Sequence, residues 1–210
     1  MSLAQWSLPR RGFIAGVTAL LAAPRVIKAE PGDPDAWIDR LTGSHRAMIQ
    51  THQYFMSALV DARTMLANAR DAYGIREGDF SIAVVTHGVA LQGLLTDETW
   101  QRFSLGEFYK VNDPKTGAPS VRNFYLDPQE GEQPDAAVRE LMPRGVVFVA
   151  CNVALKGLAR KLARGGSPDA IYPDLKNGLV PGVALVPDVF VSMTRAQDRG
   201  VRYIYTDRPR

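Results

Sequence analysis

The sequence predicts an α/β protein with a mostly parallel β-sheet of about four to five strands and helices on both faces. Apolar runs of strand length alternate along the chain with segments whose apolar residues recur every three or four positions. This alternation is typical of βα units, which build parallel sheets covered by helices. The 210 residues, of which 46% are hydrophobic and 22% charged, also suit one globular domain of ordinary size.

Residues 1–29 are typical of an export signal. Arg10 and Arg11 precede an apolar stretch, residues 13–23, that is too short to span a bilayer comfortably. Paired arginines before such a stretch predict a bacterial twin-arginine signal, with cleavage near Ala29 and a periplasmic location. The alternative is an uncleaved amphipathic anchor.

The net charge of +3 does not indicate a nucleic-acid partner. Residues 1–29 hold four basic residues and no acidic residue, so the rest of the chain carries a net charge of −1. The folded part therefore gives no electrostatic argument for binding a polyanion. After the leader, no segment has the unbroken apolar length of a transmembrane helix.

Residues 30–44 are expected to form a linker or N-terminal extension, and a single domain is expected to span residues 45–210. The apolar spacing within residues 36–55 is partly helical, so His45 and His52 would share one face of a helix. Two such histidines could contact a haem or a metal. No nearby Cys, Asp or Glu completes a ligand set, so we expect no metal and no cofactor.

A helix is predicted over residues 56–73, where an apolar stripe ends at Gly74. Residues 80–86 are a strand-length apolar run that ends at His87. His87 would then lie beyond the carboxyl end of its strand. It can act there as a general base or as the partner of a thiolate, and it can equally cap a helix or sit in a turn.

Common catalytic and nucleotide-binding motifs are absent from the sequence. Residues 88–93 have the outline of a phosphate loop, but Leu94 and Leu95 stand where Lys and Ser or Thr are required. No Gly-x-Gly-x-x-Gly follows a predicted strand, and no Gly-x-Ser-x-Gly, Cys-x-x-Cys or His-Glu-x-x-His occurs. The common hydrolase, nucleotide-binding and zinc-dependent functions therefore have no support.

The middle of the chain is the least regular part. Asp97 is expected to cap a short helix that carries Trp100. Residues 104–133 then form a long loop, and loops of this length are usually functional or mobile. This loop could be a lid, or its aromatic residues could pack against another subunit. A further helix is predicted over residues 134–141.

Cys151 lies at a predicted strand-to-helix junction. Residues 146–150 are an apolar run rich in β-branched residues, and residues 153–162 have helical spacing. Ligands of open α/β sheets bind beyond the carboxyl ends of the strands, and a helix N-terminus favours an anion there. Cys151, the only cysteine in the chain, is therefore either a reactive thiol or a small apolar residue that closes the core. An unpaired cysteine in an exported protein favours the reactive interpretation.

The last part of the chain continues the alternation of helices and strands. The sequence predicts a helix from Ser167 to Gly178, a strand over residues 182–187, a helix from Asp188 to Gly200 and a strand over residues 201–205.

Seven segments occur in the order found in one known family: residues 84–88, 105–108, 111–114, 122–123, 150–152, 179–187 and 197–204. They resemble the DsrE/DsrF-like family, and in particular its exported members with a twin-arginine signal. The resemblance implies a flavodoxin-like three-layer αβα sandwich that forms homo-oligomers. In relatives, a cysteine carries a persulfide between partner proteins, and Cys151 matches that position. The relatives more often have Gly between this Cys and the following Asn, whereas Asn152 follows Cys151 directly.

We therefore expect an exported sulfur carrier, a carrier or binding protein rather than a turnover enzyme. Cys151 would accept a sulfane sulfur from an inorganic or protein donor, while Asn152 and His87 orient or protonate the thiolate. The implied partners are other copies of the chain and sulfur donor and acceptor proteins.

Two other functions compete with the carrier. In a non-catalytic oligomeric binding module, Cys151 would be structural, and the long loop with Phe124 and Tyr125 would form a surface for a partner or ligand. A haem- or metal-binding protein would use one or more of the three histidines.

Overall fold

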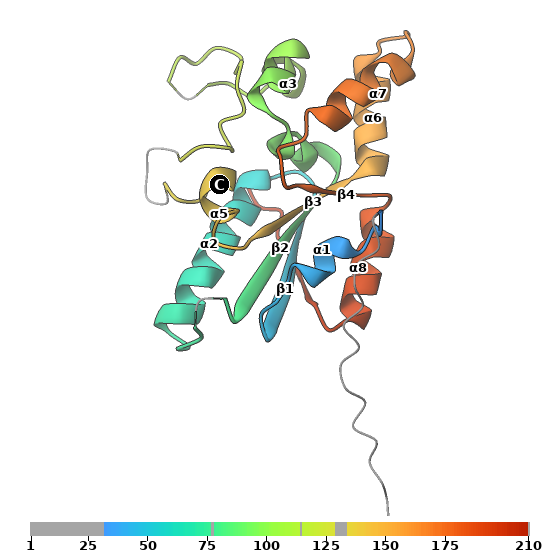
Figure 1. The fold of residues 1–210 in the computed structure, drawn as a ribbon. Helices are drawn as coiled ribbons and strands as arrows, with labels where there is room; N and C mark the ends of the chain where they lie inside the picture. The colour runs from blue at the N-terminus through green and yellow to red at the C-terminus, as the bar shows by residue number, and fades with distance from the viewer. Residues whose placement is uncertain (1–31, 77, 114, 129–133, 210) are drawn as a thin grey trace, which may run out of the picture.

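The computed structural model describes residues 32–76, 78–113, 115–128 and 134–209. These residues form a five-stranded, all-parallel sheet in the order β4-β3-β2-β1-β5 (Figure 1). The strands are β1 (His45–Thr51), β2 (Phe80–Thr86), β3 (Val147–Cys151), β4 (Ala184–Val186) and β5 (Arg202–Tyr205). The predicted α/β class, a flavodoxin-like sandwich with a parallel sheet of about four to five strands, is confirmed.

Helices cover both faces of the sheet and complete the three layers (Figure 1). The helices are α1 (Ala36–Asp39), α2 (Phe55–Asp71), the 3-10 helix η1 (Gly88–Leu94), α3 (Asp97–Arg102), α4 (Leu105–Tyr109), α5 (Val138–Leu141), α6 (Asn152–Leu162), α7 (Pro168–Asn177) and α8 (Val189–Asp198). On one face, α2 and α6 bury Leu59 and Leu155; on the other, α1 and α8 bury Trp37 and Met193. Both sheet faces are therefore buried, as a parallel sheet requires.

The export signal predicted over residues 1–29 lies outside the described residues and stays a prediction. Among the residues that the structure describes, no helix combines the length and apolar character needed to cross a membrane.

The order of the strands creates a switch point at the carboxyl end of the sheet. From β1 to β4 the chain adds strands in one direction, whereas β5 returns to the opposite edge beside β1. Right-handed crossovers place connections of opposite direction on opposite faces. The chain therefore leaves β3 for α6 on one face and leaves β4 for α8 on the other. Ligands of open α/β sheets bind in the crevice between such diverging connections.

The partly helical interpretation of residues 36–55 was wrong for its second half, because His45–Thr51 is the strand β1 next to the centre of the sheet. The helix-like spacing combined apolar residues from two elements, α1 and the doubly buried β1. His45 and His52 consequently do not share a helix face. His45 begins β1 at the amino end of the sheet, and His52 follows its carboxyl end.

Two helix starts also differ from the predictions. The helix predicted over residues 134–141 is the shorter α5, Val138–Leu141. The N-cap of α3 is Thr96, whose hydroxyl accepts a hydrogen bond from the Thr99 N–H at 3.4 Å. Asp97 instead accepts a hydrogen bond from the backbone N–H of Asn123 at 2.7 Å, so it anchors the long loop.

The N-terminal extension packs onto the domain where the structure describes it. Trp37 is 2% exposed and lies in the apolar cluster under α8, and its indole N–H donates to Ser192 Oγ at 2.8 Å. Asp35 is buried and forms ion pairs with Arg195 and, at 3.9 Å, with Arg199. The described part of this extension therefore belongs to the folded domain.

A buried asparagine fixes the long loop to residues 92–95, at the end of η1. Asn123 is 1% exposed, and its side-chain N–H groups donate to the carbonyl oxygens of Gln92, Gly93 and Leu95 at 3.3, 3.0 and 2.7 Å. Its Oδ1 accepts from the Tyr125 N–H at 3.1 Å. One side chain thus satisfies four backbone groups, in a segment predicted to be a lid or partner surface.

Replacing this asparagine should destabilise the fold strongly. Asn123→Ala leaves buried carbonyl groups without donors, and we expect it to lower the free energy of unfolding by about 3 kcal/mol in urea denaturation. Asn112→Ala is the matched control, because Asn112 is exposed in the same loop; its effect should stay within about 0.5 kcal/mol. Equal effects for the two variants would contradict the assignment.

Candidate functional site

Cys151 joins β3 to α6 at the switch point. It is the last residue of β3 and the N-cap of α6, with extended backbone angles, and Asn152 is the first residue of the helix. The Cys151 side chain makes no capping hydrogen bond. The thiol thus lies at a helix start, whose first N–H groups carry partial positive charge and favour an anion, without bonding to those groups.

The Cys151 side chain is buried. The residue is 3% exposed and belongs to an apolar cluster that includes Val149 of β3 and Val189 and Met193 of α8. This helix covers the face of the sheet on which the thiol lies. Reagents therefore have little access to the sulfur in this conformation.

The structure brings His87 beside Cys151 in the sheet. The last paired residues of β2 and β3 are Thr86 and Ala150, so His87 and Cys151 occupy the next position on each chain. His87 has extended backbone angles, and its ring contacts Phe190 of α8, with centroids 4.9 Å apart. Both residues therefore project to the α8 face. The hydrogen bond of the His87 ring goes to Gln50 rather than to Cys151.

Asn152 is a predicted site residue whose side chain does not face the thiol and His87 but bonds to another helix. Its Oδ1 accepts a hydrogen bond from the Tyr172 hydroxyl at 2.7 Å. Tyr172 belongs to α7 and packs against the apolar cluster on the α2 face. The Asn152 side chain is therefore committed to holding α6 and α7 together, away from His87.

A chain of hydrogen bonds reaches His87 from the edge of the sheet. The side-chain Nε2 of Gln50, in β1, lies 2.7 Å from Nε2 of His87. The hydroxyl of Tyr203, in β5, donates a hydrogen bond to Oε1 of Gln50 at 2.5 Å. The His52 ring lies against the His87 ring, with centroids 4.8 Å apart. The His87 ring thus contacts Gln50, His52 and Phe190.

The sequence interpretation did not find Gln50, Tyr203 or Phe190. A usable signal existed for Gln50, because Met48, Gln50 and His52 alternate as residues on one side of a strand do. The helical interpretation of this segment concealed that signal. Tyr203 offered no signal, since its contact with Gln50 depends on β5 pairing with β1.

The surroundings of His87 keep its ring neutral near pH 7. Burial lowers the pKa of His87 below 6.5, and the neighbouring His52 lowers it further because two imidazolium charges repel. Asp207 and Asp188 act in the opposite direction, but the net shift of the pKa is downward.

Among the described residues, the histidines do not join other ligands in a metal site. His45 lies at the opposite end of β1 from His52 and His87. Within the described ranges, no group of three His, Cys, Asp or Glu side chains is arranged to hold a metal ion. The arrangement offers no support for the haem or metal interpretation.

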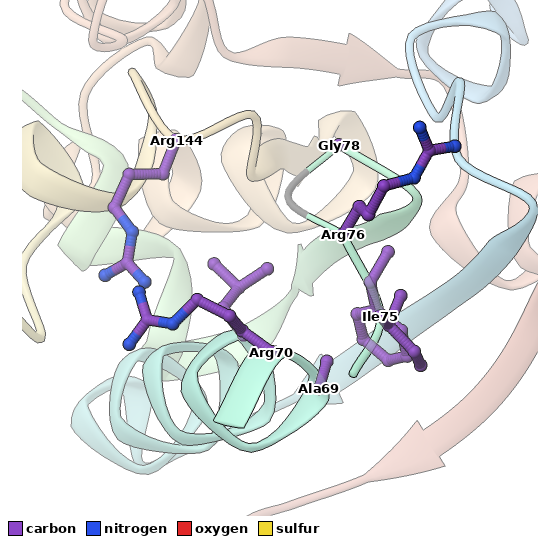
Figure 2. Close-up of a pocket in the computed structure, with 8 residues that line it drawn as sticks. Ala69, Arg70, Ile75, Arg76, Gly78 and Arg144 are labelled. Atoms are coloured by element: carbon purple, nitrogen blue, oxygen red, sulfur yellow. The ribbon is translucent and has the colours of Figure 1, made fainter. Parts of the chain in front are cut away.

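A small pocket of about 30 Å³ lies at the amino end of the sheet (Figure 2), whereas Cys151 lies at the carboxyl end. Figure 2 shows the side chains of Arg70 and Arg144 converging at its rim. Carboxylates already accompany these arginines: Asp71 pairs with Arg70 at 2.6 Å, and Asp135 pairs with Arg144 at 3.4 Å. We therefore assign no function to this pocket.

No protein-family model and no curated protein matches the chain. Among solved structures, the chain is similar to that of MTH1491, a protein of unknown function from Methanobacterium thermoautotrophicum. The TM-score is 0.40, with 19% sequence identity over 77% of this chain and 99% of that chain. The function of this chain therefore has to be argued from its own residues.

The lowered pKa of His87 predicts a specific dependence of stability on pH. Below about pH 6.5 the unfolded state binds a proton at this residue that the folded state resists. The free energy of unfolding should therefore fall as the pH drops from 6.5 through the folded-state pKa of His87. Above pH 6.5 the protonation of His87 should not affect the free energy of unfolding. Thermal denaturation of the wild type and of His87→Gln, between about pH 7.5 and about pH 5, measures this effect. The stability advantage of the wild type should shrink on acidification, and an advantage that stays constant would contradict the shift.

Proposed function

We propose that the protein is an exported sulfur carrier of the DsrE/DsrF-like type, in which Cys151 holds a persulfide. The observation that carries the proposal is the position of Cys151 as the N-cap of α6 at the switch point, with His87 beside it, directly after β2. A helix N-terminus stabilises an anion, and both the thiolate and the persulfide are anions. A reversible carrier of this kind needs one nucleophile and no cofactor.

Loading transfers one sulfane sulfur atom to Cys151. The thiolate attacks the sulfur of a polysulfide, a new S–S bond forms at Cys151, and the donor leaves as a polysulfide shortened by one sulfur. With thiosulfate as donor, the leaving group is sulfite. Discharge is the reverse: the thiolate of an acceptor attacks the outer sulfur, and Cys151 leaves as a thiolate. Charge and electrons balance in each step, so no further oxidant or reductant is required.

The proposal places the carrier in the periplasm. Arg10 and Arg11 with the short apolar stretch support export, and the twin-arginine route carries proteins that are already folded. Sulfur donor and acceptor proteins would be its transient partners. The resemblance to DsrE/DsrF-like proteins supports a homo-oligomer.

The burial of Cys151 favours a second candidate, a non-catalytic oligomeric binding module. A cysteine that is 3% exposed among valines behaves as a small apolar residue of the core. In this case Phe124 and Tyr125 are poor candidates for the binding surface, because their rings pack on Trp100 at 6.4 and 6.5 Å. Phe190, which is 55% exposed, is the better one.

The intact mass of the mature protein tests the carrier directly. After treatment with polysulfide or thiosulfate, the wild type should gain whole sulfur atoms that dithiothreitol removes. Cys151→Ser should lose this gain completely, because the chain has no other cysteine. The variant should keep the circular dichroism spectrum of the wild type.

The same experiment separates the two candidates. A sulfur gain that persists in Cys151→Ser would refute the role of this residue. A wild type that gains no sulfur, and whose native thiol resists iodoacetamide, would make Cys151 structural and favour the binding module.

A further inference from the structure

The polar chain that ends at His87 determines which ring nitrogen carries the proton. Gln50 is 8% exposed and lies between two partners on neighbouring strands. The Tyr203 hydroxyl donates to Gln50 Oε1, so the amide NH₂ of Gln50 is the group that faces His87. An amide nitrogen only donates hydrogen bonds, and His87 Nε2 must therefore accept. In the neutral ring, the proton is then on Nδ1.

The second ring nitrogen of His87 is available to a ligand. Within the described part of the chain, Nδ1 of His87 has no hydrogen-bond partner. It is also not among the buried polar atoms that lack a partner there, so Nδ1 is not fully buried. The charged and titratable groups that act on the ring are His52 after β1, Asp188 at the start of α8 and Asp207 in the C-terminal segment. Their combined effect with burial favours the neutral ring.

We propose that Gln50 and Tyr203 are positioning residues that hold His87 as the neutral Nδ1–H tautomer. His87 then acts as a hydrogen-bond donor to an anion at the switch point and not as a general base. This inference rests on the proposed function for the identity of the anion, which is the terminal sulfur of the Cys151 persulfide. The tautomer itself follows from the Tyr203–Gln50–His87 contacts alone.

The tautomer can be measured without any sulfur compound. The chain has three histidines, so a long-range ¹H–¹⁵N spectrum of the ¹⁵N-labelled protein at neutral pH contains three imidazole patterns, and His87→Gln identifies that of His87. We expect the wild type to show a protonated Nδ1 and an unprotonated Nε2. A wild type with the proton on Nε2 would overturn the proposal.

Three variants test whether the Tyr203–Gln50–His87 hydrogen bonds set the tautomer of His87. Gln50→Glu replaces the donating amide with an accepting carboxylate, so the His87 proton should move to Nε2. Tyr203→Phe removes the donor that orients Gln50, so the Nδ1–H state should no longer be exclusive. Tyr205→Phe is the matched control on the same strand, because its hydroxyl bonds Asp207 at 3.2 Å, and the tautomer should not change.

Each result has a defined meaning. An unchanged Nδ1–H pattern in Gln50→Glu would refute the role of Gln50, and an unchanged pattern in Tyr203→Phe would refute that of Tyr203. If Gln50→Glu does not fold, Tyr203→Phe carries the test, since it removes one oxygen atom from a side chain that is 44% exposed. A wild type that takes up no sulfur but shows Nδ1–H would refute the carrier and leave the tautomer assignment standing.

Discussion

The parallel register of β1, β2 and β3 is the constraint on which the candidate site depends. Because the strands run in one direction, their carboxyl ends meet at one edge of the sheet. His52 and His87 follow the last residues that β1 and β2 pair with each other, and Cys151 follows the last residue of β3 that pairs with β2. A slip of one residue in β2 would turn His87 to the opposite face, away from α8 and from Cys151. Successive residues of these strands pack into two different apolar clusters, one on each face, and such a slip would exchange the side chains between the two clusters.

The polar chain at this edge is stable because its members satisfy one another. An unsatisfied buried amide at Gln50 would cost about 1–3 kcal/mol, and Tyr203 and His87 remove that cost. Stability alone does not require this chain of hydrogen bonds, because apolar groups of the same shape can replace a matched set of polar groups at little cost in free energy. The sheet is apolar immediately below, at Met48 and Val85. The polar groups therefore begin where the strands end, at the edge of the sheet that holds the proposed site.

The sequence predicted the parts of the site that lie within one βα unit. A strand-length run that continues directly into helical spacing located both Cys151 and the carboxyl end of β3. The same pattern located His87 after β2. These predictions needed only local periodicity, which the parallel sheet preserves because each buried strand is a continuous apolar run.

Contacts between distant segments could not be predicted in this way. Tyr203 and Gln50 are separated by 153 positions and meet only because β5 returns to the edge beside β1. The role of Asn152 changed for a similar reason. Because Asn152 follows Cys151 in the sequence, we predicted that it orients or protonates the thiolate. Its hydrogen bond to Tyr172 instead depends on how α7 packs on α6.

In the proposed sulfur carrier, a neutral histidine suits this position better than a base. Once the thiolate has formed, its attack on a sulfane sulfur releases the donor's leaving group as an anion and converts Cys151 to a persulfide anion. No proton therefore has to be accepted. What the site must supply is stabilisation of negative charge at an otherwise apolar position. The start of α6 supplies partial positive charge to the sulfur attached to the protein. In the proposed site, a neutral N–H donor at His87 would add a hydrogen bond to the sulfur without burying a second charge among the valines around Cys151.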